Sequence, residues 1–151
     1  MAGMDGLGRV FDVVPLASGV NISLKNCSAV SYVVVASSTS SLAVTASTAY
    51  SGGTTDNWTP ANGFGQPAYW YQNTSDAGTA AWTKQTAVWT TNSIALAQTD
   101  GYVSVVCFRV SELADTFCYI NATETDASSC IAFLHDLTVQ RNPANLQILG
   151  V

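Results

Sequence analysis

The histidine His135 is followed directly by Asp136, and this pair is the first candidate for catalysis, because the chain has one histidine. An imidazole moves protons near neutral pH, and a carboxylate can orient it, as in serine hydrolases. The residues around the pair alternate as in a β-strand, in which neighbouring side chains point to opposite faces. We therefore do not expect Asp136 to orient the imidazole, and no G-x-S-x-G sequence supplies a nucleophile.

The other reactive residues form no recognisable metal or catalytic motif. The four cysteines, Cys27, Cys107, Cys118 and Cys130, include no C-x-x-C pair, and no D-x-D-x-D-G calcium loop occurs. We expect buried free thiols that behave as small apolar side chains. A pair of carboxylates for glycoside hydrolysis is not excluded, because the sequence does not give the distance between two acids. The prediction is a protein that is not an enzyme and binds no metal or cofactor.

The composition excludes some partners and favours others. Hydrophobic residues make up 48% of the chain and charged residues 10%, against about 25% charged residues in ordinary soluble domains. The net charge is -5, and the five basic residues do not cluster, so neither nucleic acid nor an anionic membrane is an expected partner. A surface of Ser, Thr and Asn is cheaper to desolvate than one of ions, which favours extended contact with protein.

The elements that would position these residues are β-strands, because apolar residues recur with a period of two almost throughout. A glycine-containing turn, "SDAGT" at 75–79, predicts a hairpin, and the linker 111–115 could form one helical turn. We expect an all-β fold, an antiparallel β-sandwich of jelly-roll or Greek-key type, with extended N- and C-terminal arms. The predicted strands lie at 9–16, 20–26, 29–38, 41–50, 67–74, 79–89, 94–98, 102–110, 115–124 and 129–141.

The chain then divides into an N-terminal arm (1–9), a sandwich domain (10–141) and a C-terminal arm (142–151). Within the domain, residues 51–68 form a long loop with four glycines, two prolines and the aromatic residues Trp58 and Phe64. A loop of about 15 residues is uncommon unless it has a function. The loop is either an interaction loop or a lid over one end of the core.

The C-terminal arm is too apolar for a free tail. Pro143 favours an extended backbone just before it, and Leu146, Ile148 and Leu149 follow. A terminus of this kind docks on its own domain or on a neighbour. Asp136 and Arg141 could fix the exit of the arm or pair across a subunit boundary.

Three segments resemble a group of small all-β virion proteins of tailed bacteriophages, especially phages of actinobacteria. They are "GLGRVFDVVPLASGVNISLKN" at 6–26, "SELADTFCYINA" at 111–122 and "FLHDLTVQRNPANL" at 133–146. Members of this group are virion structural, minor capsid or head decoration proteins without a catalytic motif. The resemblance covers both ends and roughly the last third of the chain.

The resemblance implies a head decoration or cement protein that binds the outer capsid surface and stabilises the lattice. The expected partner of this chain is the major capsid protein. We expect the chain itself to be a homo-oligomer, a trimer, that is made in the host cytoplasm and located on the outside of the virion capsid. A tail or connector protein and a carbohydrate-binding sandwich for host attachment are the alternatives. The predicted partner-binding residues are Leu7, Arg9, Phe11, Trp58, Phe64, Arg141, Pro143, Leu146, Ile148 and Leu149.

Overall fold

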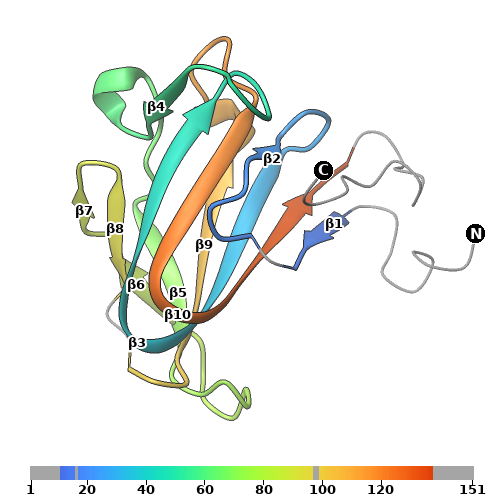
Figure 1. Cartoon of the computed structure of the whole chain (residues 1–151). Helices are drawn as coiled ribbons and strands as arrows, with labels where there is room; N and C mark the ends of the chain where they lie inside the picture. The colour runs from blue at the N-terminus through green and yellow to red at the C-terminus, as the bar shows by residue number, and fades with distance from the viewer. Residues whose placement is uncertain (1–10, 16, 97–98, 138–151) are drawn as a thin grey trace, which may run out of the picture.

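The computed structural model describes residues 11–15, 17–96 and 99–137, and this part of the chain is mostly β-structure (Figure 1). Neither of the two short 3-10 helices found there is long enough to cross a membrane. The elements are β1 (Phe11–Val14), β2 (Ile22–Ser23), β3 (Ala29–Ser47), β4 (Thr55–Asn57), η1 (Pro60–Asn62), β5 (Tyr69–Asn73), β6 (Thr83–Thr86), β7 (Trp89–Thr90), β8 (Ser93–Leu96), β9 (Val103–Arg109), η2 (Val110–Glu112) and β10 (Tyr119–His135).

The named strands join in one antiparallel sheet, which confirms the all-β prediction. The main path runs in the order β1, β10, β3, β9, β5 and β6. Strand β2 pairs with β10, β4 and β8 pair with β3, and β7 pairs with β8. Within the described residues the path ends at β1 and β6, so the sheet is open. The narrower expectation of a jelly-roll or Greek-key sandwich stays a prediction.

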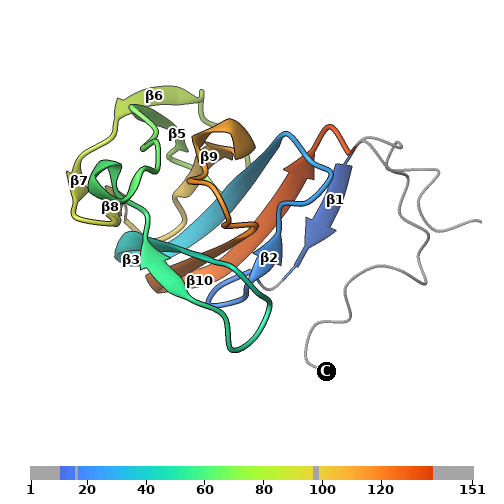
Figure 2. The ribbon, with the colours of Figure 1, turned by 90° about the horizontal axis from the view of Figure 1, so that it is seen from above.

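The two longest strands, β3 and β10, lie side by side and organise the sheet (Figures 1 and 2). Their register runs from Ala29 opposite His135 to Ser47 opposite Tyr119. The sequence predicted two strands for each of them, with a break over 123–129 in the second. That break is wrong, because the region is an irregularity of β10 in which Asp126 has φ 56° and the register shifts twice, between Thr125 and Ala127 and between Ala127 and Ser129. A β-bulge of this kind bends a strand without ending it.

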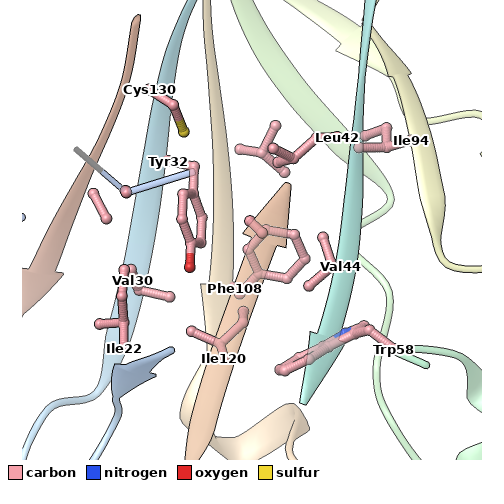
Figure 3. Packing of buried hydrophobic residues seen from close by; sticks show 14 of the residues in the cluster. Ile22, Val30, Tyr32, Leu42, Val44, Trp58, Ile94, Phe108, Ile120 and Cys130 are labelled. Carbon is pink, nitrogen blue, oxygen red and sulfur yellow. The ribbon is translucent and has the colours of Figure 1, made fainter. Parts of the chain in front are cut away.

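The bend brings side chains from both parts of β3 into one core. Tyr32 comes from the first part and Leu42 from the second, and both are fully buried. The ring of Phe108 on β9 lies between Tyr32 and Trp58, which follows β4: its centroid is 6.0 Å from that of Tyr32 and 5.4 Å from that of Trp58, with both pairs edge-on (Figure 3). Such aromatic pairs add about 0.5–1.5 kcal/mol beyond the area that they bury.

Two smaller expectations concern the connections. The predicted hairpin around 75–79 is confirmed by β5 and β6, in which Tyr71 lies opposite Lys84. Gly78 has φ 69° and occupies the left-handed conformation that a turn needs and that glycine adopts without strain. The helical turn expected within 111–115 is found one residue earlier, as η2.

Candidate functional site

The side chains of His135 and Asp136 do not act on each other, because each has its own serine partner. Nε2 of His135 lies 2.8 Å from Oγ of Ser31, whereas Oδ2 of Asp136 accepts a hydrogen bond of 2.5 Å from Oγ of Ser28. A serine beside a histidine resembles part of a hydrolase triad, but the acid that would orient the imidazole is turned to Ser28. Within 11–137, outside the gaps, no three His, Cys, Asp or Glu residues gather in a way that could hold a metal ion.

None of the four cysteines forms a disulfide, but only Cys27 and Cys130 are buried as expected. Burial raises the pKa of the Cys130 thiol from 9.0 to about 12, with a smaller effect from the negative charge of Glu124. A thiol of this kind stays protonated and unreactive at neutral pH. Cys107 is exposed, because it lies between the buried residues Val106 and Phe108 and points to the other face of β9.

The loop 51–68 carries more structure than the sequence predicted, since it contains β4 and η1. Its two aromatic residues face inward: Trp58 is 0% exposed and Phe64 is 1% exposed, with their rings stacked at 5.0 Å. Nε1 of Trp58 donates a 2.6 Å hydrogen bond to the carbonyl oxygen of Gly65. The two rings leave no surface for a partner in this conformation, so the geometry favours the lid over the interaction loop.

Hydrogen bonds from the Gln66 side chain and the Gly65 amide to backbone carbonyl oxygens hold the lid in place. Nε2 of Gln66 donates to the carbonyl oxygens of Trp58 at 3.0 Å and Thr91 at 2.7 Å. The amide of Gly65 donates to the carbonyl oxygen of Glu112 at 2.9 Å. A Cβ atom on Gly65 would lie 2.8 Å from Cγ of Glu112, so only glycine permits this close approach. Trp58 and Phe64 therefore belong to the core, whereas η1 between them is exposed.

The strands β1, β10, β3, β9, β5 and β6 present a second surface, turned away from the core, which we call the outer face. Paired residues on neighbouring strands share one face, so the register shows which side chains lie together on it. One continuous row, the outer row, crosses five strands: Ile131 on β10, Val33 on β3, Val105 on β9, Tyr71 on β5 and Lys84 on β6. The first three are half-buried, Tyr71 is 43% exposed and Lys84 is exposed.

An aromatic cluster continues the outer row at the β5–β6 edge. The rings of Tyr69 and Tyr71 meet edge-on at 5.7 Å, and Nζ of Lys84 lies 3.8 Å from the centre of the Tyr69 ring. A cation over an aromatic face is stabilised by the ring quadrupole, by about 0.5–1 kcal/mol at an exposed site. Trp82, just before β6, is 53% exposed. Exposed aromatic side chains of this kind are enriched where proteins bind other molecules.

The outward side chains of β3 change from partly apolar to mostly polar along the strand. In the first part of β3 the outward residues include Val33, whereas in the second part they are Ser41, Ala43 and Thr45. The cross-strand partners of this second part are also small or polar, namely Ala95, Ser93, Thr123, Thr125, Asn121 and Asn57. One strand and one face thus carry an apolar half and a polar half.

The predicted partner-binding residues are distributed differently from expectation. Trp58 and Phe64 are in the core, and Phe11 begins edge strand β1 with its backbone opposite His135. Leu7, Arg9, Arg141, Pro143, Leu146, Ile148 and Leu149 lie outside the described residues. The outer row was not singled out from the sequence, although the dense run "YVVVASS" held the signal: a strand apolar on both faces needs cover on both. Comparisons of the chain with protein-family models, with curated proteins and with solved structures give no match.

Proposed function

We propose that this chain is a virion structural protein of a tailed bacteriophage, a head decoration or cement protein that binds the outer surface of the capsid. The observation that supports it best is the apolar half of the outer face, which holds Val33, Val105 and Tyr71 partly open to solvent. Contiguous apolar surface of this kind marks contact sites for other proteins. The resemblance of 6–26, 111–122 and 133–146 to phage virion proteins supplies the biological context.

The low charge of the chain supports the same proposal. Charged residues make up 10% of the sequence, so a large part of the surface can enter a protein interface without burying ions. A lattice offers many equal sites, and repeated attachment gives avidity from modest individual contacts. The proposed partner is the major capsid protein. In this proposal the chain is made in the host cytoplasm and then binds the capsid exterior as a homo-oligomer, for which we expect a trimer. The proposal includes no catalytic activity.

The proposal also includes the finer fold, a β-sandwich of jelly-roll or Greek-key type with terminal arms. Its support is the way in which both parts of β3 contribute side chains to one core, as the two layers of a sandwich do.

The test is occupancy of phage heads that lack this protein. Purified wild type is mixed with the heads and co-sedimented, beside variants that lack residues 1–8 or 143–151. We expect wild type to bind and both truncations to lose binding while they keep the far-ultraviolet circular dichroism of the folded domain. Full occupancy by both truncations would refute the role of the arms, and absence of wild-type binding would refute the assignment to the head.

Attachment to carbohydrate is the second candidate, because the Tyr69–Tyr71 pair and Trp82 are exposed on one hairpin. Aromatic faces of this kind can stack on sugar rings, although Lys84 already covers one face of Tyr69. A glycan array separates the two functions. Binding that Trp82→Ala abolishes would support attachment, and an empty array would remove it. Imaging of labelled protein at the tail alone would favour a tail or connector protein instead.

A further inference from the structure

We propose that the outer row is the docking surface, and that its partner is a protein surface with apolar side chains bordered by carboxylates, repeated on the shell. The inference rests on the proposed function and adds to it the face that is used and the chemistry of the occupant. The row consists of Ile131, Val33, Val105, Tyr71 and Lys84, which succeed one another across β10, β3, β9, β5 and β6.

The first argument is that the apolar outer face is not required by the fold. The second part of β3 leaves Ser41, Ala43 and Thr45 on the same face, so the sheet forms with polar residues there. Val33 and Val105, by contrast, lie opposite each other and are partly exposed to solvent. Covering such a pair removes apolar surface from water and favours association. The apolar half is therefore a surface that a partner can cover.

The second argument is the sign of the charges on this face. Two positively charged side chains lie on this face. Lys84 ends the outer row, and Arg109 lies on β9 opposite Ala29, which is itself opposite His135. None of the residues paired in register with Ala29, Ser31, Val33 or Val35 in the described sheet is Asp or Glu. The whole chain carries a net charge of -5, and Lys25 is the one other Lys or Arg of the described residues. Two acids lie at the Arg109 end of this face: Glu112 accepts a hydrogen bond from the backbone amide of Arg109, and Asp136 follows His135. Lys84 has no acid paired with it in the register, so an acidic partner is attracted most strongly to that end of the outer row.

The third argument is size. Five strands at a spacing of about 4.8 Å make the outer row about 19 Å long, and the rows from Ala29 to Val35 extend about 20 Å along β3. The apolar half therefore covers at most about 400 Å², or half of the roughly 800 Å² per partner of a standard stable interface. This area is small for a lasting dimer of two isolated copies. It suffices for a weak contact that is repeated on a shell and strengthened by avidity.

The experiment measures binding of the purified full chain to DNA-free shells of the major capsid protein by co-sedimentation. The double variant Val33→Thr/Val105→Thr keeps the shape of both side chains but adds two hydroxyl groups to the interface. We expect it to bind about tenfold more weakly or worse, because an unpaired hydroxyl is costly to bury. Val88→Thr is the matched control, since Val88 is 63% exposed and lies outside the outer row, and it should bind as wild type does.

The charges are tested with single reversals of equal size. Arg109→Glu and Lys84→Glu should each weaken binding at low salt and reduce its salt dependence, whereas Lys25→Glu, with the same change in net charge, should not. Thermal unfolding of each variant checks that the domain remains folded. If wild type binds and the variants of Val33, Val105, Arg109 and Lys84 bind equally well, the inference is wrong and the proposed function stands.

Two further outcomes overturn the inference in other ways. Wild type that leaves the shells empty contradicts the proposed function and the docking surface together. A dimer of wild type in sedimentation velocity that Val33→Thr/Val105→Thr dissociates assigns the outer face to a second copy of the chain. Glycan binding that Val33→Thr/Val105→Thr abolishes, without shell binding by wild type, assigns the face to carbohydrate.

Discussion

Replacement of Trp58 by alanine tests whether the loop 51–68 is a lid of the core. The indole is 0% exposed, stacks on Phe64 at 5.0 Å and meets Phe108 edge-on at 5.4 Å. Removing a buried aromatic side chain costs about 3–5 kcal/mol of unfolding free energy, from lost transfer energy and from the cavity left behind. The substitution also leaves the carbonyl oxygen of Gly65 without its 2.6 Å hydrogen bond. For a domain of about 5–15 kcal/mol total stability, this is a severe loss.

Two matched variants separate the causes. Trp82→Ala removes the same side chain at a position that is 53% exposed, and we expect a change within about 0.5 kcal/mol. Trp58→Phe keeps an aromatic ring and removes the indole N–H that bonds Gly65, so it should cost less than Trp58→Ala and more than Trp82→Ala.

The assay is urea unfolding followed by far-ultraviolet circular dichroism, with the slope of free energy against urea concentration compared among the variants. The expected order of destabilisation is Trp58→Ala, then Trp58→Phe, then Trp82→Ala, at an unchanged slope. A loss below about 1 kcal/mol for Trp58→Ala, or an equal loss for Trp82→Ala, would refute the interpretation of the loop as a lid.

Three further predictions concern the close contacts and the thiols. Gly65→Ala should destabilise the domain by about 1–3 kcal/mol in thermal unfolding, because the new Cβ would meet Glu112 at 2.8 Å, and Gly65→Ala/Glu112→Ala should recover part of the loss. The pKa of Cys130 rises from 9.0 to about 12 on folding. The protonated thiol therefore contributes its full share of the unfolding free energy below pH about 9, and this share is lost as the pH rises toward 12, by at most about 1.4 kcal/mol per pH unit. In Cys130→Ala the urea midpoint should accordingly depend less on pH in this range than in wild type. Exposed Cys107 should react with a thiol reagent in the native protein, whereas Cys27 and Cys130 should react only after unfolding; equal native rates would contradict the burial.

Most of the strands could be predicted from the sequence, because the alternation of apolar and polar residues reports which face of a strand is buried; β4, within 51–68, could not. The hairpin of β5 and β6 and the position of β9 follow from turn residues and period-two runs. The continuity of β10 could not be predicted in this way. The polar run 123–129 looks like a loop, and only pairing with β3 shows that Thr125 and Ser129 belong to one strand with a bulge. Local sequence does not contain that information, because the partner lies far away in the chain.

The candidate site was predicted less well, for a related reason. Trp58 and Phe64 stand among glycines and prolines, which indicates a loop but does not indicate whether aromatic rings point inward. The register that aligns Val33, Val105 and Tyr71 depends on three separate strand pairings. Each residue is ordinary in its own strand, and the apolar row exists only once the strands are placed beside one another.

The pairing of β10 also sets the order of events during synthesis. This last described strand pairs with β1, β2 and β3, and a contact such as that between Ser28 and Asp136 joins residues 108 positions apart. Chains dominated by such distant contacts fold slowly, since loop closure precedes the gain from pairing. Until the ribosome has released the residues of β10, β3 has an unpaired edge that can recruit other chains. Yield at high expression should therefore depend on translation speed and temperature as much as on the stability of the finished domain.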